Sequence, residues 1–76
     1  MSGRPLKRSL TLHGHRTSVS LEAAFWDALR AAAEAEGVSV NALAQRIDEA
    51  RSDDEAGVGL ASAVRVWLLR RALARG

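Results

Sequence analysis

Three polar side chains near the N-terminus have the chemistry to read a nucleic acid. Arg16, Ser18 and Ser20 alternate with the apolar residues Val19 and Leu21. Alternate residues of an extended chain share one face, so the arginine and the serines would form a polar row opposite the apolar pair. Arginine can donate two parallel hydrogen bonds to guanine, and serine hydroxyls can donate to or accept from several bases. The pattern predicts a strand that contacts base edges in DNA.

Two histidines lie just before this row, in the step His13-Gly14-His15. Histidine is a common metal ligand, but two histidines without a carboxylate or cysteine nearby in the sequence make an incomplete site. We therefore expect a polar pair at a bulge, or a phosphate contact, and no metal or other cofactor. His13 and His15 stay as weak metal candidates.

The acidic residues do not form a catalytic pattern. The chain has nine of them and no cysteine, and no histidine lies at a spacing that would complete a catalytic group. A chain of 76 residues is also too short to build the walls of a cleft alone. We therefore expect a solvated helical surface and not an enzyme.

The residues around the histidines predict extended structure. Residues 9–21 alternate with period two, yet Leu10 and Leu12 are even-numbered whereas Val19 and Leu21 are odd-numbered. In one uninterrupted strand these two pairs would face opposite sides. Gly14 indicates the break, because glycine admits a bulge or a turn. We expect one short strand here.

Three helices are expected after the strand. Residues 22–36 are almost all strong helix formers, and Gly37 is a plausible left-handed cap. Ser39 would cap a second helix of about a dozen residues. Ser20 is an alternative N-cap for the first helix, a role that would compete with its predicted base contact. A third helix, at about residues 60–74, has apolar residues on two faces. The expected segments are a flexible basic arm (1–8), a core (9–50), an acidic and glycine-bearing connector (51–59) and a C-terminal helix (60–76).

Charge is segregated along the chain although the net charge is only +2. Residues 1–20 carry +4, residues 21–56 carry −6 and residues 57–76 carry +4. A basic N-terminal end favours contact with a polyanion. The longest apolar window is interrupted by arginines, so we expect no membrane span, and the absence of cysteine fits a cytoplasmic protein.

A lone strand needs a partner, because its edges leave backbone donors and acceptors unpaired. The nearest identical strand belongs to a second copy, and two copies paired about a two-fold axis would make a two-stranded antiparallel ribbon above four helices. A ribbon of that width fits the major groove. The expected partners are double-stranded DNA and a second copy, as a homodimer or a tetramer. The expected dimer core consists of Val19, Leu21, Phe25, Trp26, Leu29, Leu43 and Ile47.

The runs GHRTSVSLEAAFWDAL and EGVSVNAL resemble the ribbon-helix-helix DNA-binding proteins, and in particular a bacterial subgroup with a third helix after the core. The resemblance implies a mostly α-helical, intertwined homodimer whose intermolecular ribbon reads bases through Arg16, Ser18 and Ser20. It also implies that the start of the second helix binds a DNA phosphate. Together with the basic arm, the expected phosphate contacts are Arg4, Lys7, Arg8, Val38, Ser39, Val40 and Asn41.

Three functions are compatible with these features. The leading one is a transcriptional repressor that occupies an operator. The second is an antitoxin, which would bind DNA and use its C-terminal helix on a toxin. The third is a protein-interaction scaffold without DNA binding. Replacing Arg16 with alanine would separate the first two from the third.

Overall fold

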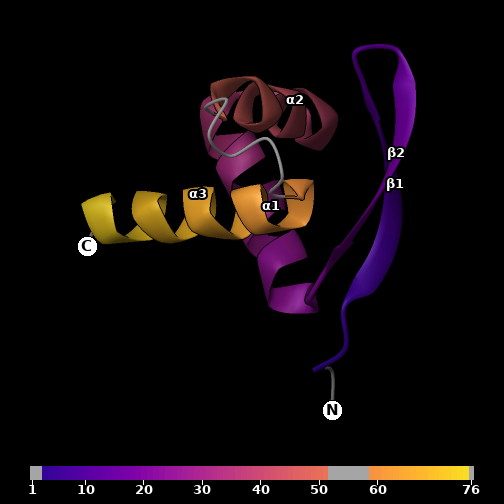
Figure 1. Ribbon diagram of the computed structural model, residues 1–76. Helices are drawn as coiled ribbons and strands as arrows, with labels where there is room; N and C mark the ends of the chain where they lie inside the picture. Colours follow the sequence, from indigo (N-terminus) through magenta and orange to yellow (C-terminus); the bar gives the residue numbers. More distant parts are fainter. Residues whose placement is uncertain (1–2, 52–58, 76) are drawn as a thin grey trace.

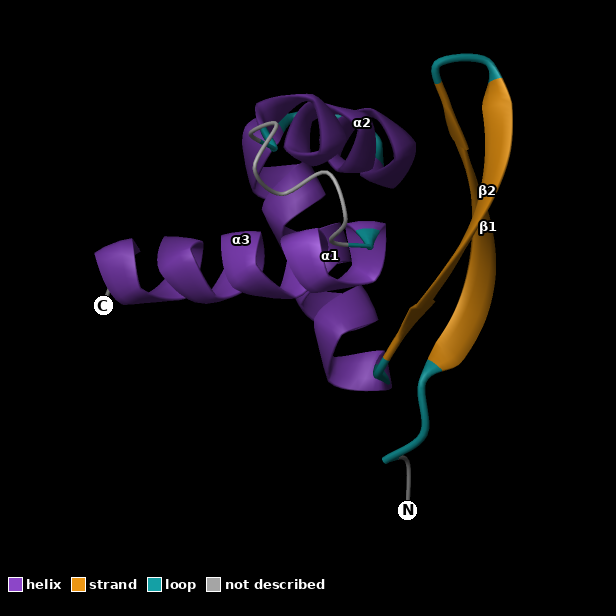
Figure 2. Cartoon of the chain, viewed as in Figure 1, coloured by secondary structure: helices purple, strands orange, loops and turns teal. Residues whose placement is uncertain are grey.

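The protein consists of a two-stranded antiparallel ribbon that stands beside three helices (Figure 1). The computed structural model describes residues 3–51 and 59–75. In chain order the elements are β1 (Leu6–Leu12), β2 (His15–Leu21), α1 (Ala23–Glu36), α2 (Val40–Ala50) and α3 (Leu60–Arg75). Figure 2 shows that all three helices lie on one side of the ribbon, where they cross one another. The mostly helical architecture with a further C-terminal helix is therefore as predicted.

A two-residue turn joins the strands within one chain. Leu12 pairs with His15, and the intervening His13 and Gly14 have φ angles of 54° and 79°. Positive φ at both central residues is what a tight type I′ hairpin requires, and its twist matches that of the strands. Glycine adopts this conformation without steric cost, whereas histidine adopts it at some cost. The break expected at Gly14 is thus a hairpin turn.

The turn reverses the chain, and this explains why the apolar residues are even-numbered before Gly14 and odd-numbered after it. Residues that pair across an antiparallel ribbon share a face, and an even-numbered residue of β1 pairs with an odd-numbered residue of β2 throughout. Leu10 and Leu12 therefore face the helices together with Val19 and Leu21, and all four are buried.

The prediction of one strand per chain, paired only with a second copy, is corrected by this hairpin. Residues 6–12, which the prediction divided between the arm and the start of the core, form the partner strand, so the ribbon is complete within one chain. The physical reason is that a two-residue turn brings the nearest strand edge from the same chain. A homodimer stays a prediction.

The core lies between the ribbon and the helices of a single chain. It holds buried apolar side chains from both strands and all three helices, and no polar residue among the described ones is buried. Six of the seven residues expected in a dimer core are buried in the chain itself, and Phe25 is partly buried against them. These seven residues therefore pack together in the core of one chain, and their part in a dimer stays a prediction. The buried residues are Leu10, Leu12, Val19, Leu21, Trp26, Leu29, Ala32, Ala33, Leu43, Ala44, Ile47, Leu60, Val64 and Leu68.

The observed caps at the end of α1 and at the start of α2 agree with those predicted from the sequence. Gly37 caps α1 with a φ of 71°, and its N–H donates to the carbonyls of Ala33 and Glu34. The Ser39 hydroxyl accepts from the N–H of Ala42 at 3.0 Å, as predicted for the start of α2. The start of α1 differs: Glu22 occupies the N-cap position without a side-chain cap, so Ser20 does not cap this helix.

Ion pairs attach α3 to both ends of α1. Arg65 donates from Nε and Nη2 to Oε1 of Glu22, at 3.0 and 2.9 Å, and Arg71 Nη1 lies 3.1 Å from Oε2 of Glu36. A backbone hydrogen bond, followed by that of Arg65, lowers the pKa of Glu22. The hydrogen bond and charge of Arg71, followed by those of Arg46, lower the pKa of Glu36. Acids that the sequence assigned to a solvated surface thus position α3.

The connector expected at 51–59 is described only at its ends, because residues 52–58 lie outside the described part of the chain. Arg51 follows α2 in extended conformation, and Gly59 precedes α3. Residues 1, 2 and 76 of the expected arm and C-terminal segment are likewise not described. None of the described helices is both long and apolar enough to cross a membrane.

Candidate nucleic-acid interface

The face of the ribbon turned away from the helices carries six polar side chains, which we call the outer row. They form three cross-strand pairs: Lys7 with Ser20, Ser9 with Ser18, and Thr11 with Arg16. Five of the six are exposed and Ser20 is partly exposed. The row contains two cations, four hydroxyls and no acid. Arg16, Ser18 and Ser20 therefore share one solvent-facing surface, as their spacing predicted.

Half of the outer row comes from β1 and was not expected in this role. Lys7 was assigned to a flexible arm as a phosphate contact, and Ser9 and Thr11 were not singled out. They join the row because the turn at His13 and Gly14 pairs them with the polar residues of β2. Alternation across a two-residue turn is the sequence signal that could have identified them.

The chemistry of the outer row suits a duplex groove. Two cations on a surface without acids attract phosphate, and arginine can also bind guanine with two donors. Hydroxyls donate and accept hydrogen bonds and so tolerate several bases. A two-stranded ribbon is narrow enough to enter the major groove of B-DNA, which is about 12 Å wide.

The edge of β1 is held by side chains of α2. Oδ1 of Asn41 accepts from the backbone N–H of Thr11 at 2.7 Å, and Nδ2 of Asn41 donates to the carbonyl of the same residue. Oε1 of Gln45 accepts from the N–H of His13 at 3.2 Å. The Asn41 amide thus occupies the backbone groups that a third strand would pair with.

Helix α3 and Trp26 hold two other points of the ribbon. Nη2 of Arg65 lies 3.4 Å from the carbonyl of Ser20 in β2, and Nε1 of Trp26 donates to the carbonyl of Leu6 at 2.8 Å. The ribbon is therefore anchored by α1, α2 and α3 along its length. Such anchoring fixes the outer row relative to the helices, which favours a preformed binding surface.

The predicted phosphate contacts are placed in different surroundings. Arg4 is exposed just before β1, at the open end of the ribbon. Arg8 lies on the inner side of the ribbon, where its guanidinium is 5.5 Å from the centroid of the Trp26 ring. A cation over an aromatic face is attracted by the ring, so this side chain is directed away from the outer row.

The start of α2 lies beside β1, because Asn41 is bonded to Thr11. Its two valines, Val38 and Val40, pack against the core, and the Ser39 hydroxyl caps the helix. The backbone N–H groups of Ser39, Val40 and Asn41 can be offered to a phosphate, which the helix dipole favours, whereas the N–H of Val38 donates to the carbonyl of Ala33 at 3.0 Å. The Asn41 side chain is committed to the ribbon, so its predicted phosphate contact is left to the backbone.

The two histidines lie at the tip of the hairpin, His13 in the turn and His15 at the start of β2. Nε2 of His13 is 3.4 Å from Oδ2 of Asp48, and Nδ1 of His13 is 3.8 Å from Oε2 of Glu49. His15 is exposed opposite Leu12. Within residues 3–51 and 59–75, no group of three or more histidines, cysteines or acids gathers in a way that could hold a metal ion.

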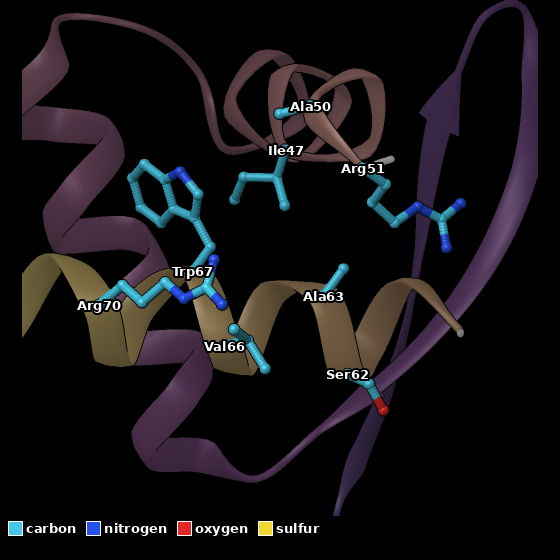
Figure 3. Close-up of a pocket in the computed structure, with 8 residues that line it drawn as sticks. All are labelled: Ile47, Ala50, Arg51, Ser62, Ala63, Val66, Trp67 and Arg70. Carbon is cyan, nitrogen blue, oxygen red and sulfur yellow. The ribbon is translucent and has the colours of Figure 1, made fainter. Parts of the chain in front are cut away.

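A separate pocket of about 170 Å³ lies between α2 and α3 (Figure 3). Its lining is mainly apolar, with Arg51 and Arg70 as the charged members, and the Ser62 hydroxyl points away from Ile47 (Figure 3). Trp67 is partly buried here, and the guanidinium of Arg71 lies 5.6 Å from its ring centroid. The pocket lining includes neither an acid nor a histidine.

Comparison with known proteins gives one family match. A model described as a ribbon-helix-helix domain matches residues 5–72, a range that includes both strands, α1, α2 and most of α3. No curated protein matches the chain, and no solved structure matches it.

Proposed function

Because this chain belongs to the ribbon-helix-helix family, whose members are typically DNA-binding regulators and not enzymes, we propose that it binds double-stranded DNA through the outer row. The observation that supports this most directly is the row itself, which has six polar side chains, two of them cationic, on a solvent-facing ribbon without an acid. In this proposal the ribbon enters the major groove.

Each part of the row has its own role in the proposal. Arg16 reads guanine, and Ser18 and Ser20 contact neighbouring base edges. Lys7, beside Ser20 on the same surface, contacts a phosphate or a base near the open end of the ribbon. Arg4 and the backbone at the start of α2 add phosphate contacts that set the register of the ribbon on DNA.

We further propose that the protein is a transcriptional repressor, which acts by occupying an operator. An antitoxin would need a toxin bound to α3 in addition, and a scaffold would need a protein partner and no DNA. Transcription in vitro from a template that carries the preferred site should fall when wild-type protein is added, and should not fall with the Arg16→Ala variant.

The test of DNA binding begins with selection of a preferred duplex from a random library at low salt. Affinity for that duplex is then measured by fluorescence anisotropy for the wild type, for Arg16→Ala and for Arg30→Ala. Arg30 is an exposed arginine of α1 that pairs with Asp27, so its removal changes the net charge equally at a site outside the row. The Arg16 variant should lose about 1–3 kcal/mol of binding free energy, and the Arg30 variant should bind nearly as the wild type.

Two results would overturn the proposal. One is an absence of binding at low salt, or binding that does not weaken as salt is added, because phosphate contacts release counterions. The other is an equal loss in the Arg16 and Arg30 variants, which would show that only net charge matters.

A further inference from the structure

The pocket between α2 and α3 has an apolar interior with a cation at its edge, and the proposed DNA binding uses neither. Ile47 and Ala50 of α2 face Ala63, Val66 and Trp67 of α3 across it (Figure 3). The three α3 residues share one side of their helix, because a spacing of three and four residues returns to the same face. Ile47 is only 2% exposed and belongs to the core. The pocket is therefore built on two helices and on the core itself, which favours a preformed shape.

The size of this pocket matches a single six-membered ring. Its volume is about 170 Å³, and in another protein a cavity of roughly 150 Å³ between apolar side chains holds benzene. Trp67 offers an aromatic surface against which a second ring can pack, offset or edge to face. The guanidinium of Arg71 lies 5.6 Å from the centroid of the Trp67 ring, and this attraction helps to hold the ring in place. One aromatic ring therefore suits the interior in both size and chemistry.

Arg70 supplies the charge at the edge of the pocket. It is exposed, and it forms no ion pair within the part of the chain that the structure describes. The other arginine of the lining, Arg51, pairs with Asp48, and its side chain extends away from Ile47 (Figure 3). None of the described lining residues is an acid, so no carboxylate of the lining competes for Arg70. A guanidinium binds a carboxylate through two parallel hydrogen bonds, so the pocket is complementary to that group.

We propose that the α2–α3 pocket binds a small aromatic carboxylate, with its ring between Ile47, Val66 and Trp67 and its carboxylate paired with Arg70. A phosphate or an acetate would leave the apolar interior unfilled, and a neutral ring would leave the cation without a partner. The pocket shares no residue with the outer row, so the two sites can be tested separately.

The experiment is an NMR titration of the full chain with benzoate in the absence of DNA. The signals followed are the indole N–H of Trp67 and the backbone amides of α2 and α3. Benzoate should shift them saturably, with a dissociation constant on the order of 1 mM or lower, as expected for so small a ligand. Benzamide keeps the ring without the charge, and acetate keeps the charge without the ring. Each should bind about tenfold more weakly than benzoate.

Two substitutions address the two parts of the site. Arg70→Gln removes the charge and keeps a polar side chain, so benzoate should bind about tenfold more weakly while benzamide binds as before. Ala63→Leu fills the interior with a larger side chain, so both ligands should lose binding. Circular dichroism should show that Arg70→Gln keeps the fold, because Arg70 is exposed.

Two controls make the test specific. Arg75→Gln removes the same charge from an exposed position of α3 that does not line this pocket, and it should bind benzoate as the wild type does. Arg16→Ala should also leave benzoate binding unchanged, which separates this inference from the proposed DNA binding.

Three results would overturn the inference. One is a set of shifts that grows linearly with benzoate and does not saturate at tenfold the expected dissociation constant. Another is equal benzoate binding by the wild type and by Arg70→Gln, which would show that Arg70 does not hold the carboxylate. The third is acetate binding as tight as that of benzoate, which would reduce the site to a charge on the surface. If Ala63→Leu loses its fold by circular dichroism, the Arg70 variant decides alone.

Discussion

Asn41 of α2 pairs with the backbone of Thr11 in β1 as a neighbouring strand would. Its Oδ1 accepts from the Thr11 N–H at 2.7 Å, and its Nδ2 donates to the Thr11 carbonyl. The Thr11 side chain lies in the outer row, opposite Arg16. One amide therefore closes the strand edge and fixes the outer row relative to the start of α2.

Removal of this amide should loosen the ribbon. Asn41→Ala loses both hydrogen bonds, each worth about 0.5–1.5 kcal/mol, so the free energy of unfolding should fall by about 1–3 kcal/mol. Hydrogen exchange of the Thr11 amide should accelerate, as measured by NMR. Gln45→Ala removes only the one acceptor for the His13 N–H and should show a smaller effect. Unchanged exchange at Thr11 in the alanine variant would contradict this role.

The hairpin turn should be sensitive to its glycine. Gly14 has a φ of 79° with open space around its Cα, so Gly14→Ala introduces backbone strain and no steric overlap. We expect a loss of about 1–2 kcal/mol in urea unfolding. His13→Asn should be tolerated better, because asparagine readily adopts positive φ and Asn-Gly favours this turn. Equal losses in the two variants would contradict the turn assignment.

The cations of the outer row should determine the salt dependence of DNA binding. If Lys7 contacts a phosphate, Lys7→Ala should lower affinity on all duplexes alike and reduce the slope of log K against log salt by about 1. The measurement is a salt titration by fluorescence anisotropy, with Arg30→Ala as the control of equal charge. A slope that changes equally in both variants would show that Lys7 makes no specific phosphate contact.

Low pH should weaken the ion pairs that hold α3 against α1. The pKa of Glu36 is lowered by Arg71 and then by Arg46, so its ion pairs stabilise the fold at neutral pH and are lost as the pH falls below about 4.3, the usual value for glutamate. Thermal unfolding should therefore show a falling melting temperature from pH 5 to about pH 3. Glu36→Gln should be less stable than the wild type at pH 7 and should depend less on pH. Glu34→Gln, at an exposed position of the same helix, is the control.

Local sequence patterns predicted the three helices and the extended conformation of residues 9–21, because the determinants of these elements are themselves local. Gly37 and Ser39 mark the helix ends through backbone conformation and a cap that reaches three residues. The alternation of Arg16, Ser18 and Ser20 with apolar residues settles which face of β2 meets solvent.

Only the tertiary structure decided which groups meet across long distances in the chain. The phase change around Gly14 was visible in the sequence, but it was compatible with a bulge or a turn, and only the turn brings Ser9 and Thr11 into the outer row. Likewise, an arginine near a strand can face solvent or an aromatic ring, and Arg8 lies over Trp26.

The same distinction applies to the partner of the strand. The sequence by itself determined that the strand needed one, because unpaired backbone groups are costly. The structure decided that β1, with Asn41 at its edge, supplies that partner within the chain. A preference for hydrogen bonding belongs to every residue, whereas the choice of partner depends on how turns and packing bring distant residues together.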